Sequence, residues 1–483
     1  MKKRLVFSVL GKFLIIEAIL LLLPALCSLI YKEYNQLISF LITAGISAAI
    51  GFVMWIQYPK RTDLYAKEGL LIIGSVWILW SLIGALPFYI SGEIKSYIDA
   101  FFETVSGFTT TGATILTDIE AMSHGMLFWR AFTHWIGGMG VLVFVMAIIP
   151  LSDKNSIHLM RAEVPGPVVS KLVPRGMRNA KILYGIYIAL CVVEFIFLYA
   201  GGMPIFDSII HTFSTAGTGG FSCKNASVAA YGSPYIEWVI TVFMFLFSIN
   251  FNIYYFMIMR KFIAIKNNSE WKIFTSIVVI ATILLSVSTR TYYTNLHDNI
   301  RTAAFQTVSI ISTTGFGTVD YNYWPGFSHT IILVLMIIGA CAGSTGGGLK
   351  VSRITILFKS ARKTLHNLVS PNSVSNIKID KKPIDDDTVR ATSAYVVIYI
   401  IVFIVANILL SINNLSVEET LATVISCINN VGPGLGITGP VGNYSTLTDF
   451  SKIVLSLTML LGRLELFPIL IMFVPALWRK KFV

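Results

Sequence analysis

Four segments of the chain combine threonine, serine and glycine in one recurring pattern, which could coordinate a cation through main-chain oxygens. Their final glycines stand about 100 residues apart, and this regular spacing indicates an internal repeat. The first and third segments share Thr-Val-Ser and Thr-Thr-Gly in register, and Ser426 of the fourth falls where Ser106 and Ser309 fall. We name these stretches glycine segments 1 to 4, in chain order: 104–112, 211–219, 307–315 and 424–432.

Rings of main-chain carbonyls from four such loops could replace the water around a monovalent cation, as they do in potassium channels. Glycine suits this backbone because a Cβ atom would obstruct the strained conformation that turns the carbonyls inward. No carboxylate stands among the candidates, which argues against a ring of Asp or Glu for a divalent cation. The candidate filter residues are Thr110, Thr111, Gly112, Ala113 and Thr114; Thr218, Gly219, Gly220 and Phe221; Thr314, Gly315, Phe316 and Gly317; and Val431, Gly432, Pro433 and Gly434.

The rest of the sequence places these segments in a membrane. Hydrophobic residues make up 55% of the 483-residue chain and charged residues 13%, against roughly 25% in soluble domains. A soluble globular protein is therefore excluded. Apolar runs long enough to cross a bilayer predict ten transmembrane helices, near residues 10–31, 36–57, 68–91, 125–150, 181–201, 235–260, 272–290, 326–348, 391–412 and 451–478.

A single Thr-Gly pair is more often a turn or a helix-packing motif than an ion site, but four pairs in register favour a shared role. Non-helical backbone at membrane depth is tolerated where protein buries it or water reaches it. The predicted fold is therefore an all-α membrane protein with ten transmembrane helices, four re-entrant pore loops and four fused helix-loop-helix repeats in a pseudo-fourfold arrangement. Its predicted parts are an N-terminal helix pair at 1–63 and pore repeats at 64–153, 154–265, 266–365 and 366–483.

The net charge of +12 could suggest a nucleic-acid partner, but the positions of the basic residues favour a membrane explanation without nucleic acid. Ten crossings put both termini on one side, and the positive-inside rule assigns that side to the cytoplasm. The five cysteines show neither paired nor metal-like spacing, so no disulfide framework or zinc site is predicted. The basic clusters on the cytoplasmic side are 2–4, 60–61, 154–181, 260–272, 350–382 and 479–481.

A further glycine-rich stretch interrupts the predicted helix 326–348. Five glycines stand between 339 and 348, and each costs about 1 kcal/mol in a helix interior, so we expect this helix to be broken. Close packing between helices is the alternative explanation. A phosphate-binding loop fits worse, because Leu349 stands where the Walker pattern requires lysine. The residues of the expected loop are Gly343, Ser344, Thr345, Gly346, Gly347 and Gly348.

Arg463 lies well inside the last apolar run, where a charged side chain is costly and marks a functional candidate. An ion pair with Glu465 or snorkelling to the interface are the structural alternatives. Glu17, Glu103 and Glu194 also lie near membrane depth, where structural pairing accounts for them better than proton transport.

On these residues the chain resembles the TrkH and TrkG pore subunits of bacterial Trk potassium uptake systems, within the superfamily that includes the KtrB and HKT transporters. The resemblance covers essentially the whole chain, and the extra helix pair before the first repeat is similar to Trk proteins rather than to KtrB. It rests on Thr-Thr-Thr-Gly-Ala-Thr at 109–114, Trp-Ile-Gly-Gly-Met-Gly-Val at 135–141, Thr-Gly-Gly-Phe-Ser at 218–222, Gly-Ala-Cys-Ala-Gly-Ser-Thr-Gly-Gly-Gly-Leu-Lys at 339–350 and Leu-Gly-Arg-Leu-Glu-Leu-Phe at 461–467.

The resemblance implies roles for several of these residues. It implies that 343–348, with Lys350 at the end of the same motif, forms a gating loop below the filter, and that Arg463 opposes this loop as an electrostatic barrier. Pro433 makes the fourth loop different from the others, so equivalence of the four loops is not assumed. One filter glycine is implied in each loop: Gly112, Gly219, Gly315 and Gly432.

The resemblance also implies partners. A homodimer is expected, together with a TrkA-like cytoplasmic ring that binds nucleotides. The basic segments 151–181 and 350–390 are docking candidates for this ring, and the alternative is that their charge only sets the membrane topology. This chain carries no nucleotide-binding fingerprint of its own.

We therefore expect potassium as the substrate, with no organic cofactor, entering bacteria through a selective, gated pore in the inner membrane and driven by the membrane potential. Proton- or sodium-coupled symport is the alternative. An intramembrane enzyme is not supported, because His134, Ser344 and Glu465 show no nucleophile and base spacing. An inverted-repeat transporter is disfavoured, because each repeat holds two crossings and so keeps one orientation.

Overall fold

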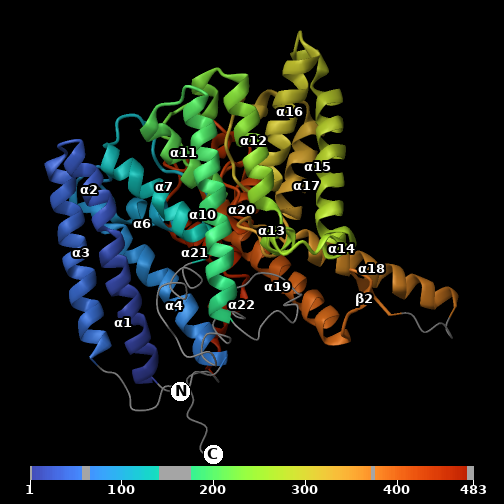
Figure 1. The fold of residues 1–483 in the computed structure, drawn as a ribbon, viewed down its shortest axis with the longest axis horizontal. Coiled ribbons are helices and arrows are strands. Elements are labelled where there is room, and N and C mark those ends of the chain that lie inside the picture. The colour runs from blue at the N-terminus through green and yellow to red at the C-terminus, as the bar shows by residue number, and fades with distance from the viewer. Residues whose placement is uncertain (1–2, 57–65, 141–175, 371–375, 476–483) are drawn as a thin grey trace, which may run out of the picture.

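The computed structural model describes residues 3–56, 66–140, 176–370 and 376–475 (Figure 1). The regular elements of the described structure are helices, apart from one antiparallel two-stranded hairpin, β1 (Lys378–Ile379) and β2 (Lys382–Pro383). The end of the predicted helix 125–150, most of the docking candidate 151–181 and the basic residues at 2, 60–61 and 479–481 lie outside the described residues.

Two apolar helical runs at the N-terminus pack closely at one side of the molecule (Figure 1). α1 (Lys3–Leu20) continues almost directly into α2 (Leu22–Ile30), and α3 (Tyr34–Trp55) returns against them. A Cβ atom on Gly11 of α1 would strike the carbonyl oxygen of Gly51 in α3, and the reverse also holds. Paired small residues let helix backbones approach closely. Such packing matters in a membrane, because the hydrophobic effect does not drive helices together in lipid.

Four short helices show the same pattern: each has at least one acidic residue in its first turn, and the C-terminal half of each is buried. Acidic side chains there favour the helix, because its N-terminus carries partial positive charge. In the last of the four, Ser416 and Glu419 also form a capping box. Each glycine segment begins inside one of these helices and leaves it at the C-terminal end: α6 (Tyr97–Phe108), α11 (Ile205–Gly217), α16 (Leu296–Ile311) and α20 (Val417–Ile428).

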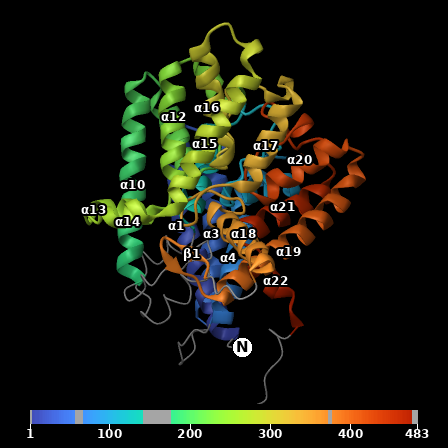
Figure 2. The ribbon, with the colours of Figure 1, turned by 90° about the vertical axis from the view of Figure 1, so that its right-hand side faces the viewer.

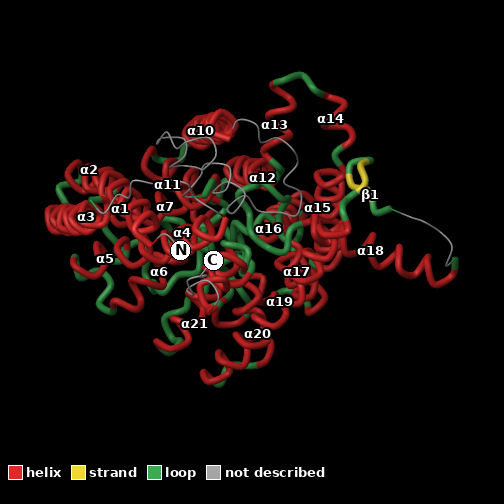
Figure 3. The backbone as a smooth tube through the Cα atoms, turned by 90° about the horizontal axis from the view of Figure 1, so that it is seen from below, coloured by secondary structure: helices red, strands yellow, loops and turns green. Residues whose placement is uncertain are grey.

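The remaining helices pack beside these four (Figure 2), and in the view from below the loops gather near the middle of the assembly (Figure 3). Short 3₁₀ turns connect some of them: η1 (Ser227–Tyr231), η2 (Arg290–Tyr292), η3 (Tyr321–Tyr323), η4 (Ser411–Asn413) and η5 (Gly436–Thr438). The surrounding helices are α4 (Ala66–Gly84), α5 (Leu86–Ile90), α7 (His124–Gly138), α10 (Gly176–Ala200), α12 (Pro234–Ser248), α13 (Phe251–Ile258), α14 (Phe262–Asn267), α15 (Ser269–Ser288), α17 (Gly326–Ile338), α18 (Val351–Val369), α19 (Asp386–Leu410), α21 (Asp449–Arg463) and α22 (Phe467–Leu470), which runs into η6 (Ile471–Phe473).

Within the described residues, six helical runs are long and apolar enough to cross a membrane, or eight if two bent pairs are included. The pair α12 and α13 bends by 88°, and α21 bends by 117° against the run Phe467–Phe473. All eight coincide with predicted helices. The predicted helix 326–348 is represented by the shorter α17, and α7 covers the described start of 125–150, so the total of ten stays a prediction.

The predicted break after α17 is confirmed. α17 ends at Ile338, and residues 339–350 have no regular structure before α18 begins. Gly339 and Gly348 cross so closely that a Cβ atom on either would overlap the other's backbone, and both have a positive φ, of 69° and 83°. α18 then projects away from the main body of the molecule (Figures 1 and 3).

Candidate functional site

All four glycine segments leave their helices through the same turn. The amide after the left-handed residue of this turn bonds back to the carbonyl of the serine five residues earlier: Thr111 to Ser106 at 2.9 Å, Gly219 to Ser214 at 2.8 Å, Thr314 to Ser309 at 2.9 Å and Val431 to Ser426 at 2.9 Å. This is the Schellman motif, whose left-handed residue is usually glycine. Here it is Thr110 (φ 53°), Thr218 (53°), Thr313 (61°) and Asn430 (55°).

Threonine is branched at Cβ, so the left-handed conformation strains it by roughly 1–3 kcal/mol, and such strain gathers at functional sites. Two of these side chains make contacts that glycine could not. Thr313 Oγ1 accepts a hydrogen bond from the Gly347 amide at 2.7 Å, and Asn430 Nδ2 donates to Thr111 Oγ1 at 3.0 Å and to the Met459 carbonyl at 2.9 Å.

The residue after this amide is a glycine with positive φ in every segment, and we call these four residues the ring glycines: Gly112 (80°), Gly220 (77°), Gly315 (80°) and Gly432 (99°). In the second segment the position belongs to Gly220, whereas alignment on the last glycine of the segment predicted Gly219. That assignment was one residue out of register. The sequence pattern fits either of the two adjacent glycines. The serines decide the alignment, because Ser214 stands six residues before Gly220, as Ser106 stands six residues before Gly112.

The four loops close into a ring. A Cβ atom on each ring glycine would overlap the carbonyl oxygen that precedes the ring glycine of the next loop: Gly112 meets Gly219 O, Gly220 meets Thr314 O, Gly315 meets Val431 O and Gly432 meets Thr111 O. The loops therefore follow one another in the order 1, 2, 3, 4 and back to 1. Within the described part of the chain these four carbonyls accept no hydrogen bond, so their dipoles are available to a cation.

The outermost candidates of the sequence analysis are placed differently. The Thr114 carbonyl accepts from the Tyr444 amide at 2.8 Å, and the Gly434 carbonyl accepts from Tyr321 Oη at 2.9 Å. The Gly317 carbonyl accepts from the Ala229 amide at 3.3 Å. Because these oxygens are bound to protein, the ring itself is confined to the residues beside the ring glycines.

In each segment, the residue nine positions before the ring glycine lies on the short helix. It forms a hydrogen bond with a residue that follows the ring glycine, and we call these contacts bracing pairs. The position is the same in every segment, but the chemistry is a carboxylate, an imidazole, an amide and a hydroxyl in turn. The bracing pairs are Glu103 with Thr114 at 2.9 Å, His211 with Ser222 at 3.1 Å, Gln306 with Thr318 at 3.3 Å and Thr423 with Thr438 at 2.9 Å.

The carboxylate brace is part of a buried ion pair. Arg130 Nε donates to Glu103 Oε1 at 2.8 Å, and both side chains are almost inaccessible. The same guanidinium lies 4.0 Å from the ring centroid of Phe221, beside ring glycine Gly220. Glu103, for which the sequence analysis expected structural pairing without naming a partner, therefore joins the first loop to the second through Arg130.

On the outgoing side, the first two loops are tied by a polar cluster. Asn225 Nδ2 donates to Asp118 Oδ1 at 2.8 Å, and the Ile119 amide donates to Asn225 Oδ1 at 2.7 Å. The bond from Asn225 lowers the pKa of the Asp118 carboxyl from its ordinary value, because it stabilises the ionised form.

The loop 339–350 lies against two of the four segments. Besides the bond from Gly347 to Thr313, a Cβ atom on Gly346 would crowd the Ser312 carbonyl, and one on Gly347 would overlap the Asn429 carbonyl. Gly346 and Gly347 thus sit directly beside the turns of segments 3 and 4.

The start of the loop faces another element. The Phe251 amide, at the bend between α12 and α13, donates to the Gly343 carbonyl at 3.0 Å, and Ser344 Oγ donates to the Cys341 carbonyl at 2.6 Å. Gly343 therefore anchors the loop to this bend, whereas Ser344 bonds within the loop. Lys350, which is buried, donates from Nζ to the Gly346 carbonyl and folds the end of the loop back on itself.

Arg463, the last residue of α21, is the contact between this loop and the opposite side. Its guanidinium donates to the Thr345 carbonyl at 2.6 Å and to the Gly138 carbonyl at 2.7 Å, and it also binds the Gly137 carbonyl. One side chain thus joins α21, the loop and the end of α7.

Two further charged groups take part here. The sequence analysis did not name Glu270, and it considered Glu465 as an ion-pair partner of Arg463. Glu270, in the first turn of α15, accepts through Oε1 from the Ala342 amide at 2.7 Å and the Ser352 amide at 3.1 Å, which lie at the two ends of the loop. Glu465 pairs with Arg353 of α18. The sequence offered one signal for Glu270, an acidic residue in the first turn of an apolar helix. That signal did not indicate that its partners are the amides of Ala342 and Ser352.

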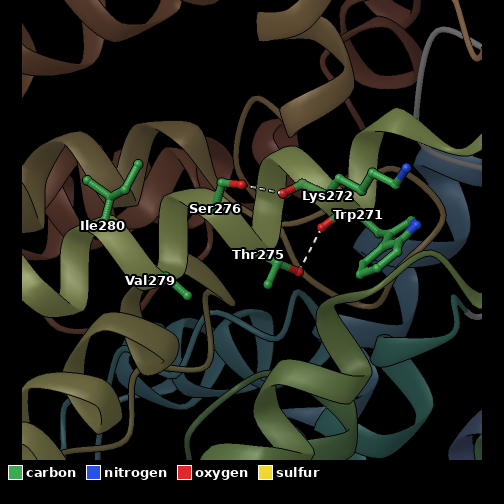
Figure 4. Close-up of a pocket in the computed structure, with 6 residues that line it drawn as sticks. All are labelled: Trp271, Lys272, Thr275, Ser276, Val279 and Ile280. Carbon is green, nitrogen blue, oxygen red and sulfur yellow. Dashed lines mark hydrogen bonds between the residues drawn. The ribbon is translucent and has the colours of Figure 1, made fainter. Parts of the chain in front are cut away.

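A surface cavity of about 430 Å³ lies along α15, away from the ring (Figure 4). Thr275 and Ser276 line it, and their hydroxyls donate to the carbonyls of Trp271 and Lys272 one turn earlier, at 2.8 and 2.9 Å. Since these hydroxyls are already bound within the helix, we place the functional site at the ring.

Comparison with known proteins agrees with this geometry. The pattern of the TrkH family, described as cation transport proteins, matches residues 37–480. The chain belongs to the TrkH family. A Trk system potassium uptake protein TrkH from Salmonella typhimurium is 36% identical across 99% of both chains, and TrkG from Escherichia coli is 32% identical over the same shares. A crystal structure of the potassium transporter TrkH from Vibrio parahaemolyticus superposes with a TM-score of 0.90 at 31% identity, over 99% of this chain and 100% of that one.

Family membership and the apolar helices together make this a multi-pass protein of the inner membrane and a member of a transporter family. The resemblance that the sequence motifs indicated is thereby confirmed.

Proposed function

We propose that this protein carries potassium ions into the cell through a selective, gated pore. The closed ring of four glycine loops, with four carbonyls that accept no hydrogen bond in the described structure, is the observation that supports it. A monovalent cation can exchange its hydration water for such oxygens. The names of the TrkH and TrkG relatives, potassium uptake proteins, support potassium as the substrate, and no organic cofactor is proposed.

We further propose ten crossings and four repeats in a pseudo-fourfold arrangement, bounded at 64–153, 154–265, 266–365 and 366–483, with the helix pair 1–63 outside them. The cyclic order of the ring contacts supports this arrangement. The four loops would be re-entrant, since irregular backbone within a membrane needs burial by protein or access to water. Both termini would face the cytoplasm, as the basic clusters indicate.

The membrane potential can drive the uptake. It supplies about 2.3 kcal/mol per charge for each 100 mV, which corresponds to roughly fifty-fold accumulation without a coupled ion.

The gate would be the loop 343–348 with Arg463. Its contacts with the turns of segments 3 and 4 support a position next to the ring, and the guanidinium opposes a cation electrostatically. Lys350 would stabilise the closed form through its bond to the Gly346 carbonyl.

For partners, we propose a homodimer and a nucleotide-binding cytoplasmic ring of the TrkA kind. The second proposal is supported by α18, which projects from the bundle and exposes Phe358, Leu365 and Leu368 together with the basic residue Arg362. A helix with both apolar and basic exposed side chains suits a protein partner at a membrane surface.

Uptake of labelled potassium by liposomes that contain the purified protein tests the function. The potential is inside-negative, and pH and sodium are equal on both sides. We expect uptake that rubidium inhibits and sodium does not. Uptake that requires a proton or sodium gradient would contradict the pore and favour symport, and uptake that requires a nucleotide-bound partner would identify obligatory gating.

A further inference from the structure

The four short helices carry a serine at the same place, six residues before each ring glycine, and all four serines are buried. Their hydroxyls behave differently. Within the described residues, the hydroxyls of Ser106 and Ser214 have no partner. Ser309 Oγ donates to the Phe316 carbonyl at 2.7 Å, and Ser426 Oγ donates to the Gly432 carbonyl at 2.7 Å.

A second hydroxyl reaches the same oxygen of Gly432. Tyr444 Oη donates to it at 2.7 Å, so both lone pairs of this carbonyl are used. Tyr444 is buried and held in place: its amide donates to the Thr114 carbonyl at 2.8 Å, and its ring lies 5.4 Å from that of Phe102. The tyrosine therefore stands behind the ring, between the fourth loop and the first.

The other three ring glycines differ from Gly432. In the described structure, the carbonyls of Gly112, Gly220 and Gly315 accept no hydrogen bond. The fourth loop also differs in the next residue, Pro433, which has no amide hydrogen. Three carbonyls at this level are available to a ligand, and the fourth is held from behind by two hydroxyls.

We infer that Ser426 and Tyr444 withdraw the Gly432 carbonyl from the ion path, so that a cation at the level of the ring glycines meets three protein carbonyls and a water molecule. This inference rests on the proposed potassium pore. The two residues are specificity-determining, because selectivity among monovalent cations depends on the number and field strength of the coordinating carbonyl dipoles. A site with three carbonyls binds potassium less tightly than one with four and releases it faster.

The test compares Tyr444→Phe, Ser426→Ala and the double variant with wild type in the liposome uptake assay. Tyr444→Phe keeps the ring against Phe102, and Ser426→Ala keeps the helix backbone. Ser214→Ala is the matched control, because it removes the equivalent hydroxyl where that hydroxyl has no partner among the described residues. The KM for potassium and the maximal rate of uptake are measured for each, together with the preference for potassium over sodium from the reversal potential in planar bilayers.

We expect the double variant to lower the KM for potassium about fivefold, to lower the maximal rate and to raise the preference for potassium over sodium, since one recovered carbonyl ligand is comparable to one hydrogen bond. Each single variant moves in the same direction by less, and Ser214→Ala stays at the wild-type values. Values for the double variant equal to wild type, or changes equal to those of Ser214→Ala, would overturn the inference while wild-type uptake upholds the pore. Wild-type protein without potassium uptake under any of the conditions above would overturn both.

Discussion

The ring and the loop 339–350 both depend on glycine, but they use it differently. In the ring, each glycine lies against a carbonyl of the next segment, and the same Schellman turn holds all four loops through main-chain bonds. The loop 339–350 is a single chain segment, and it is held by hydrogen bonds with a few side chains: Glu270, Thr313, Lys350 and Arg463. A structure shared among four chain segments resists change, whereas one held by a few side chains can be released by altering any of them. This contrast agrees with the proposal that the ring is a fixed filter and the loop a movable gate.

The largest effect is expected in the ring. Gly112→Val places a branched Cβ at φ 80° and against the Gly219 carbonyl, so strain and overlap should disturb two loops together. Potassium uptake by liposomes should fall by at least about a hundredfold, as a penalty of roughly 3 kcal/mol predicts. Gly45→Val is the control, because a Cβ atom there meets nothing within 4 Å. Equal losses of potassium uptake in the two variants would show that a ring glycine tolerates a branched side chain no worse than a glycine elsewhere in the protein.

A change at the proposed gate should act in the opposite direction. Arg463→Gln removes the positive charge and weakens the contacts to the Thr345 and Gly138 carbonyls, so uptake without a regulatory partner should rise about tenfold. Arg463→Lys keeps the charge and should stay closer to wild type. A lower rate in Arg463→Gln, measured in protein of unchanged thermal stability, would show that the arginine assists conduction.

Glu270→Gln should loosen the loop with a smaller effect. Hydrogen bonds to a charged acceptor contribute about 1.5–3 kcal/mol, and this carboxylate serves the amides of Ala342 and Ser352. Hydrogen exchange of both amides should accelerate at least about tenfold, while exchange at the Thr111 and Thr314 amides of the ring should not change. Equal acceleration at all four amides would mean that the variant destabilises the whole protein.

The smallest effect is expected for Thr313→Val, which removes the hydroxyl that accepts from the Gly347 amide. One neutral hydrogen bond contributes about 1 kcal/mol, so uptake without a partner should rise about fivefold. Thr218→Val is the control at the same turn position, because that hydroxyl bonds the carbonyl of Gly217 in its own loop. Similar effects of the two variants would assign the change to the turn rather than to the loop.

Sequence patterns were sufficient where the information was local. Repeated Thr-Gly pairs located the four segments, and the glycine density of 339–348 located the break after α17, because both follow from backbone conformation. The alignment of the second segment was one residue out of register, because the sequence pattern fits Gly219 and Gly220 equally well. Separating them required the hydrogen bond from Gly219 to Ser214.

Long-range pairing was beyond the sequence. Tyr444 is 12 residues from Gly432, and Glu270 is 72 residues from Ala342. No periodicity or motif connects such positions, because tertiary packing brings them together. Glu103 shows the same limit: its depth in the membrane was evident, but Arg130 and Thr114 as its partners were not.

The central claim is that the four loops form one selectivity filter, and the ion preference of Gly315→Ser tests it most directly. A Cβ atom on Gly315 would overlap the Val431 carbonyl, so this change should distort the ring where loops 3 and 4 meet. The reversal potential with potassium on one side and sodium on the other is measured for folded protein in planar bilayers. We predict that it shifts toward zero relative to wild type, which signals lost preference for potassium. An unaltered reversal potential in the folded variant would contradict the filter.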